Sequence, residues 1–193
     1  YVLRTNFGLS LPENMREEVG YTVKDISDKA HKELTPAIIY QIFEDHYVTS
    51  KSIFQVSECH FRQENGIVAN ATIQHGQNTQ VVTGTGNGRL DAVSNAIKNY
   101  FNVSYELSFY EERSLTKGSS SKAVAYVGVV CNGRRYWGVG IDNDIIKASI
   151  EALTVAVNKI EEIQNAQFAK DKRMVEICLL YTSPSPRDGL LSR

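Results

Sequence analysis

The chain has few of the features that mark several large protein classes. Its 193 residues include only three cysteines and four prolines. Cys59, Cys131 and Cys178 are odd in number and far apart, which fits reduced thiols in a cytosolic protein better than a disulfide framework. No apolar run approaches the roughly 20 residues needed to cross a bilayer. The sequence therefore predicts a cytoplasmic protein without a membrane partner.

An excess of charge of one sign is also missing, because 21 basic residues face 22 acidic ones. Such a balance leaves no net field that would attract nucleic acid. In contrast, 42% of the residues are hydrophobic, which is enough for a packed core and excludes the disordered class. The chain opens at Tyr1 without an initiator methionine or a signal-peptide pattern, so we expect a fragment of a longer protein.

The first 48 residues carry helix signals. Pro12 suits the first turn of a helix, and apolar residues then recur on one helical face. Thr35 and Pro36 form a second start signal, an N-cap residue followed by proline. We therefore predict a small helical subdomain over residues 1–48.

From residue 53 the apolar period becomes that of strands, and one order of elements occurs twice. Strands are expected over residues 53–61, 67–74 and 79–83 before a helix over 89–101, and again over 103–110, 122–131 and 134–139 before a helix over 144–160. Asn132-Gly133 is the strongest hairpin signal, and the run 123–127 is apolar on both faces, as in a central strand. The fold class is thus α+β, with a helical subdomain followed by a pseudo-duplicated βββα-βββα domain over residues 52–162.

A Gly-x-Gly sequence leads into each of the two expected domain helices, at Gly84-Thr-Gly86 and at Gly138-Val-Gly140. Neither is a dinucleotide fingerprint or a phosphate loop. Two interpretations remain open. Either the glycines only permit a tight turn, or the backbone N–H groups and the helix dipole there bind a small anion such as a carboxylate. The second helix also carries alanines in four-residue steps at positions 148, 152 and 156, which suit close packing on a sheet or on another subunit.

No residue pattern indicates catalysis or metal binding. The four histidines form neither His-x-His nor a helical pair, no Ser or Cys nucleophile has a recognisable setting, and no carboxylate has a recognisable acid/base setting. These histidines are His31, His46, His60 and His75. The chain ends differently again: residues 181–189 are aperiodic with two prolines, and 178–188 resemble translated sequencing-adapter sequence. We expect residues 170–193 to be a disordered or artefactual tail.

Several short motifs together resemble one family. They read GTGNG at residues 84–88, YEERSL at 110–115, GSSSKAVAY at 118–126 and WGVGIDNDI at 137–145, with GLSLP at 8–12 and LTP at 34–36. Over about residues 1–162 the chain is similar to the 2-isopropylmalate synthases, namely to their C-terminal regulatory domain and the helical subdomain before it.

That resemblance implies an acyltransferase of leucine biosynthesis, which condenses acetyl-CoA with 2-oxoisovalerate and holds a divalent metal in a (β/α)8 barrel. The barrel is absent from this sequence, so no cofactor and no catalytic residue are expected within it. The resemblance further implies a homodimer that binds leucine between regulatory domains for feedback inhibition.

By the same resemblance, the leucine pocket would be formed by Gly86, Asn87, Gly88, Leu90, Leu107, Tyr110, Ser121 and Ala123. The carboxylate would lie at the glycine junction and the isobutyl group against Leu90, Leu107 and Tyr110. Arg89 departs from the family where proline is common, and Ser121 where alanine is common. Two alternatives stay open: a regulatory domain of a citramalate synthase that senses isoleucine, and a stand-alone amino-acid-binding module with no enzyme attached.

Overall fold

The computed structural model describes residues 1–31, 33–49, 52–115 and 121–182. Its first part is helical, with α1 (Val2–Phe7), α2 (Glu13–Ala30), α3 (Pro36–Phe43) and a π-helical turn, η1 (Glu44–Val48). The Thr35 hydroxyl accepts a hydrogen bond from the Ile38 amide at 3.3 Å, and Pro36 occupies the first turn of α3. The start signal read from the sequence is therefore confirmed at this helix.

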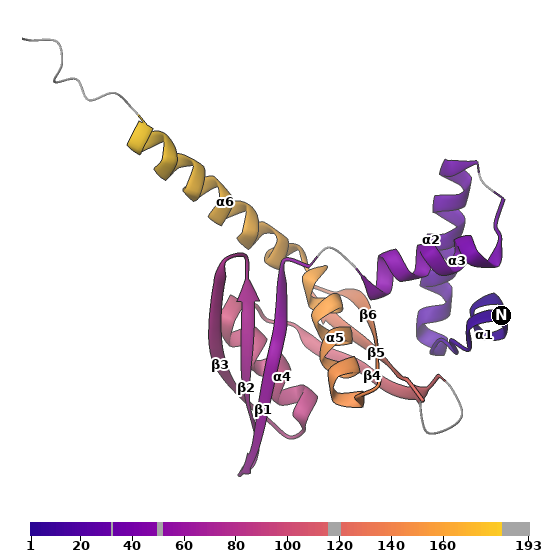
Figure 1. The fold of residues 1–193 in the computed structure, drawn as a ribbon, viewed down its shortest axis with the longest axis horizontal. Coiled ribbons are helices and arrows are strands. Elements are labelled where there is room, and N and C mark those ends of the chain that lie inside the picture. Colours follow the sequence, from indigo (N-terminus) through magenta and orange to yellow (C-terminus); the bar gives the residue numbers. More distant parts are fainter. Residues whose placement is uncertain (32, 50–51, 116–120, 183–193) are drawn as a thin grey trace, which may run out of the picture.

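Two βββα units follow, and the predicted fold class is confirmed. The first unit contains β1 (Phe54–Glu64), β2 (Gly66–His75), β3 (Asn78–Gly86) and α4 (Arg89–Phe101), and the second contains β4 (Glu106–Ser114), β5 (Ala123–Cys131), β6 (Arg134–Asp142) and α5 (Ile145–Asn158). Each unit is a three-stranded antiparallel sheet with its strands in sequence order (Figure 1). Asn132 and Gly133 form the tight turn between β5 and β6, both at positive φ.

The strand register shows which residues of the two units are equivalent. Ala69 pairs with Gly84 in the first sheet, and Ala125 pairs with Gly140 in the second. The first strand of each unit also has an irregularity at the same level, after Val56 in β1 and after Leu107 in β4. The structural repeat thus makes Gly84 equivalent to Gly140. An alignment of the two Gly-x-Gly sequences alone would instead pair Gly84 with Gly138.

The glycines of both junctions allow each helix to lie directly on its sheet. A Cβ at Gly84 would lie 2.8 Å from the Cα of Ala96 and still closer to the Ala92 carbonyl oxygen. At Gly140 it would lie 2.8 Å from the Ala152 amide nitrogen. Contacts this short to backbone atoms cannot be relieved by a side-chain rotation. Close packing of the helix on its own sheet therefore explains these glycines and the alanine steps of α5.

Two hydrophobic clusters divide the core. The larger lies between the sheets and their helices, and the second lies behind the sheet of the second unit. In the second cluster Tyr126, Trp137 and Val139 pack against residues of the helical subdomain such as Met15 and Phe43. This explains why β5 is buried on both faces, as its apolar run predicts. Among the described residues, none covers the same face of the first sheet in this way, and Val81, which is equivalent to Trp137, is 63% exposed.

Two polar side chains near the end of α5 join the units and the helical subdomain. The buried Asn158 amide accepts from the Ile53 and Phe54 amides at 2.8 and 3.1 Å and donates to the Phe54 carbonyl at 3.0 Å. The Lys159 ammonium donates to the Trp137 carbonyl at 2.6 Å and lies 4.4 Å from the centre of the Tyr47 ring. Burial lowers the pKa of Lys159 to about 8, and the charge of Glu18 partly opposes this.

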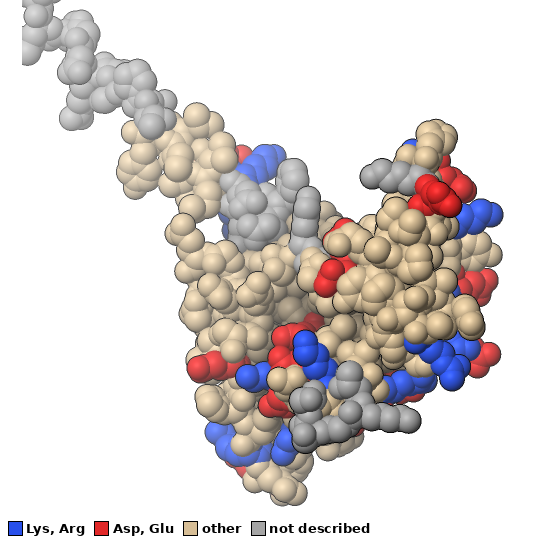
Figure 2. Space-filling model, turned by 45° about the vertical axis from the view of Figure 1, so that its right-hand side comes forward, with Lys and Arg blue, Asp and Glu red and all other residues tan. Residues whose placement is uncertain are grey.

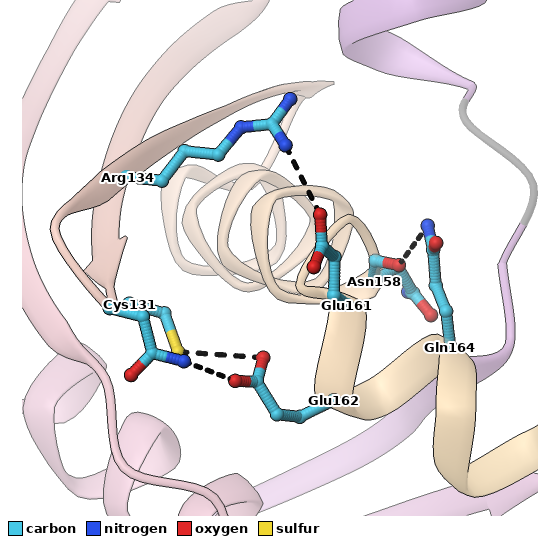
Figure 3. Close-up of polar contacts among 7 residues, drawn as sticks. Cys131, Arg134, Asn158, Glu161, Glu162 and Gln164 are labelled. Atoms are coloured by element: carbon cyan, nitrogen blue, oxygen red, sulfur yellow. Dashed lines mark hydrogen bonds and ion pairs between the residues drawn. The ribbon is translucent and has the colours of Figure 1, made fainter.

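The chain continues into α6 (Glu161–Thr182). Figure 3 shows how its first turn is held: Glu161 pairs with Arg134 at 3.3 Å, Glu162 contacts Asn132 and Cys131, and the Gln164 amide approaches the Asn158 carbonyl at 3.5 Å. Beyond this turn the helix extends away from the units (Figure 1), and the side chains of residues 172–181 are exposed.

The part of the predicted tail up to Thr182 is helical rather than disordered, and the alternative that the tail is artefactual stays a prediction. The prolines that suggested disorder begin at Pro184, and no proline or glycine interrupts the helix before that point. The rest of the predicted tail, 183–193, lies outside the described residues.

The surface carries charges of both signs. On the face shown in Figure 2, basic and acidic side chains are interspersed, with no broad area of one sign. In the described ranges, no helix is both long enough and apolar enough to cross a membrane.

Candidate functional site

A pocket of about 410 Å³ lies where the two units meet. We call it the inter-unit pocket, because β1 and the start of α4 contribute from the first unit, and β4 and the first half of α5 from the second. α5 packs mainly over β5 and β6, which leaves the inner side of the edge strand β4 to face the pocket. Its lining residues are Phe61, Gly88, Arg89, Leu90, Asp91, Leu107, Tyr110, Ile146, Ser149 and Ile150.

Several site residues predicted from the sequence come together here. Gly88 and Leu90 line the pocket from the start of α4, and Leu107 and Tyr110 line it from β4. Asn87 lies in the turn before α4 and does not line the pocket. Its backbone amide donates to the Asp91 carboxylate at 3.0 Å.

Gly86, at the end of β3, does not line the pocket either. A Cβ at Gly86 would lie 2.6 Å from the Ala92 amide nitrogen, so this glycine serves the packing of α4 on its sheet.

Two further predicted residues, Ser121 and Ala123, do not line this pocket either. Ala123 begins β5, where it pairs with Ser114 and Asp142, and the Ser121 hydroxyl hydrogen-bonds that of Ser114 at 2.5 Å. The β4–β5 register places this end of the sheet far along the strands from Leu107, which pairs with Val129. The family motif locates Ser121 and Ala123 in the sequence, whereas the strand pairing determines how far they lie from the pocket.

The pocket also contains residues that sequence reasoning did not assign to it. Phe61, Asp91, Ile146, Ser149 and Ile150 line it, and so does Arg89, which had been noted only as a departure from the family. The internal repeat could have predicted the α5 residues of the pocket, because α5 follows the second glycine junction as α4 follows the first. Its apolar stripe through residues 146 and 150 faces the pocket in the same way as Leu90 of α4.

The wall between β4 and α5 is polar at one point. The Tyr110 hydroxyl lies 2.8 Å from the Ser149 hydroxyl and donates to the Glu112 carboxylate at 2.9 Å. Ser149 in turn donates to the Ile145 carbonyl at 2.7 Å. Burial and the Glu112 charge raise the pKa of Tyr110, against the lowering effect of the Ser149 hydrogen bond. The phenol is therefore neutral at physiological pH and 41% exposed at the mouth of the pocket.

The starts of the two domain helices differ. α5 is capped by Asp144, whose carboxylate accepts from the Ile146 amide at 2.8 Å. α4 has Gly88 at its N-cap, which provides no side-chain hydrogen bond. The inter-unit pocket thus combines apolar walls with polar groups at two places: the start of α4 with Arg89, and the Tyr110 hydroxyl between β4 and α5. No group of three or more His, Cys, Asp or Glu side chains suited to a metal occurs within the described ranges.

Comparison with known proteins agrees with this architecture. The family model described as "LeuA allosteric (dimerisation) domain" matches residues 33–161, most of the chain. The chain belongs to this family. The LeuA domain match covers both βββα units and the inter-unit pocket between them, together with α3 of the helical subdomain.

The relatives of this LeuA domain include longer proteins. The 2-isopropylmalate synthase of Helicobacter hepaticus is 43% identical over 169 residues, covering 83% of this chain and 30% of that protein. The Desulfitobacterium hafniense protein of the same name is 40% identical over 159 residues, 82% of this chain and 28% of that protein. That of Brucella melitensis is 33% identical over 165 residues, again 83% and 30%. The chain thus spans about 30% of the length of these relatives, and the resemblance inferred from its motifs is confirmed.

Proposed function

We propose that this LeuA domain and its helical subdomain form the C-terminal regulatory part of a 2-isopropylmalate synthase, and that the inter-unit pocket binds leucine as a feedback inhibitor. The names of the relatives support the assignment of the parent protein as a 2-isopropylmalate synthase. The observation that supports the ligand is the pocket itself, which combines apolar side chains with a few polar groups in about 410 Å³. Pockets of this size, with few polar groups among apolar walls, suit small ligands.

The chemistry of the pocket matches the parts of a leucine molecule. Leu107, Ile146 and Ile150 provide an apolar surface for an isobutyl group. The start of α4 at Gly88 suits a carboxylate, because its first amide groups point along the helix axis with no side-chain cap. The hydroxyls of Tyr110 and Ser149 keep lone pairs that can accept from an ammonium group.

We further propose that the chain forms a homodimer in the cytoplasm, as the family description "allosteric (dimerisation) domain" suggests. In the whole protein, the parent activity would be condensation of acetyl-CoA with 2-oxoisovalerate, with a divalent metal held by a part of the enzyme outside this chain. The purified chain should therefore release no CoA from these substrates.

Isoleucine is the second candidate ligand, because a citramalate synthase regulator would use a similar apolar pocket. Calorimetry with leucine, isoleucine and valine on the purified chain distinguishes these ligands. We expect leucine to bind most tightly and Tyr110→Ala to weaken it by roughly 1–3 kcal/mol, the scale of lost apolar burial. Tyr21→Ala is the matched control, since Tyr21 is 66% exposed on α2 and lies outside the pocket. Isoleucine binding tighter than leucine would favour the citramalate synthase alternative, and absence of binding by all three would refute the proposal.

A further inference from the structure

The inter-unit pocket contains one charged side chain that the surrounding protein does not neutralise. Of its lining residues, Arg89 and Asp91 carry charge. Asp91 is engaged by the turn before α4, since its carboxylate accepts from the Asn87 amide at 3.0 Å. The Arg89 guanidinium lies 5.6 Å from the centre of the Phe61 ring and makes no hydrogen bond or ion pair with another described residue. Its stacking partner Phe61 also lines the pocket, so the cation is held at the pocket wall.

The internal duplication provides a comparison within the same chain. Gly88 and Arg89 at the start of α4 are equivalent to Asp144 and Ile145 at the start of α5. In the second unit the Asp144 carboxylate caps the helix, so that end needs no external anion. In the first unit a glycine leaves the equivalent place open, and an arginine stands beside it. Both helix starts border the pocket, but only that of α4 lacks a side-chain cap and carries an arginine at its first position.

We propose that Arg89, stacked on Phe61, binds the carboxylate of the amino acid in the inter-unit pocket and fixes its orientation toward the start of α4. This inference rests on the proposed function and deepens it. A guanidinium can bind both oxygens of a carboxylate in one plane, which a single backbone amide cannot do. With the carboxylate so placed, the ligand side chain lies toward Leu107 and Ile150. The pocket therefore selects ligands with a free carboxylate as well as an apolar side chain.

The test compares leucine with leucinamide, which keeps the ammonium and isobutyl groups but has no carboxylate. Affinities are measured by calorimetry on the purified chain and on Arg89→Gln. We expect the unsubstituted chain to prefer leucine by at least tenfold and Arg89→Gln to lose this preference, mainly through weaker leucine binding. Arg135→Gln is the matched control, because Arg135 also stacks on an aromatic ring, that of Trp137 at 5.7 Å, but lies outside the inter-unit pocket.

A second variant gives the α4 start the cap that α5 has. In Gly88→Asp, the new carboxylate should occupy the place of the ligand carboxylate, as Asp144 does at α5. The Cβ of residue 88 would meet nothing within 4 Å, and its φ of −136° suits any residue, so the fold should tolerate the change. We expect leucine affinity to fall at least tenfold while the thermal midpoint is kept or raised.

The outcomes separate this inference from the proposed function. If the unsubstituted chain binds leucine and Arg89→Gln keeps its preference over leucinamide, Arg89 does not bind the carboxylate and the inference is overturned, while the proposed function stands. Equal weakening of both ligands in Arg89→Gln would assign Arg89 to the shape of the pocket and would also overturn it. If the unsubstituted chain binds no amino acid, the proposed function fails first and the inference with it.

Discussion

Replacing Gly84 by alanine tests whether the junction glycines serve helix packing. The new Cβ would lie 2.8 Å from the Ala96 Cα and closer still to the Ala92 carbonyl oxygen, where carbon atoms normally stay about 3.5–4.0 Å apart. Both neighbours are backbone, so α4 must move off the sheet by roughly 1 Å to restore normal contact. The underside of α4, including Val93 and Ile97, is fully buried and would lose packing.

The expected cost follows from this geometry. Over-packing of a core usually costs 1–3 kcal/mol, and a clash with backbone belongs at the upper end, so we expect Gly84→Ala to lower the free energy of unfolding by about 3 kcal/mol. Gly88→Ala is the control, because its Cβ would meet open space at a φ of −136°. There the gain from a less flexible unfolded chain roughly offsets the poorer N-cap, so the change should stay within about 0.5 kcal/mol.

Urea denaturation measures both variants, with far-ultraviolet circular dichroism and the fluorescence of Trp137, the only tryptophan, as probes. Trp137 is 1% exposed in the second cluster, so its emission reports loss of that core. Equal unfolding midpoints for the two alanine variants would refute the packing role of Gly84. The glycine junction would then have to be explained by its backbone donors alone.

Two further predictions concern Lys159 and α6. Between pH 8 and 10 the unfolded chain binds more protons at Lys159 than the folded chain does, because its folded pKa is about 8 and its ordinary value 10.5, so the contribution of Lys159 to stability should rise with pH by at most about 3 kcal/mol. Lys159→Met should lack this rise in urea denaturation at pH 7.5, 9 and 10, and parallel pH curves for the two proteins would contradict the assignment. Deleting residues after Lys170 should change the free energy of unfolding by less than about 0.5 kcal/mol, since the side chains of 172–181 are exposed; a thermal midpoint several degrees lower would show that this part of the chain packs.

The sequence alone was sufficient where the signal is local. Thr35 before Pro36, the Asn132-Gly133 turn and the alternating strands all depend on neighbours within a few residues, and each is present as expected. The apolar run through β5 also predicted burial on both faces, because a strand covered on one side only would alternate. The π-helical turn at Glu44–Val48 has no comparable local signature and was not anticipated.

The pocket needed information that is not local. Phe61, Leu107 and Ile150 lie far apart in sequence and meet only because β1, β4 and α5 come together between the units. Strand register determines which of these residues lie close together, and a sequence motif contains no information on register. The family resemblance places Ala123 in the same site as Tyr110, whereas the β4–β5 pairing separates the two residues. The polar role of Asn158 was missed for the same reason, since its partners at Ile53 and Phe54 are more than a hundred positions away in sequence.

The two copies of the βββα unit differ where their surroundings differ. In the second unit the back of the sheet carries Trp137 under the helical subdomain, and the helix start is closed by Asp144. In the first unit the equivalent sheet position is the exposed Val81, and the helix start is open at Gly88 beside Arg89.

α5 lies between the inter-unit pocket and the helical subdomain. α5 lines the inter-unit pocket with Ile146 and Ile150 near its start, and at its end Asn158 hydrogen-bonds the start of β1 while Lys159 contacts Tyr47 of the helical subdomain. A close-packed helix transmits displacement along its length because its interior contacts are stiff. α5, a helix of fourteen residues packed on its sheet through alanine and glycine, thus extends from the inter-unit pocket to the start of β1, and Lys159 directly after it contacts the helical subdomain.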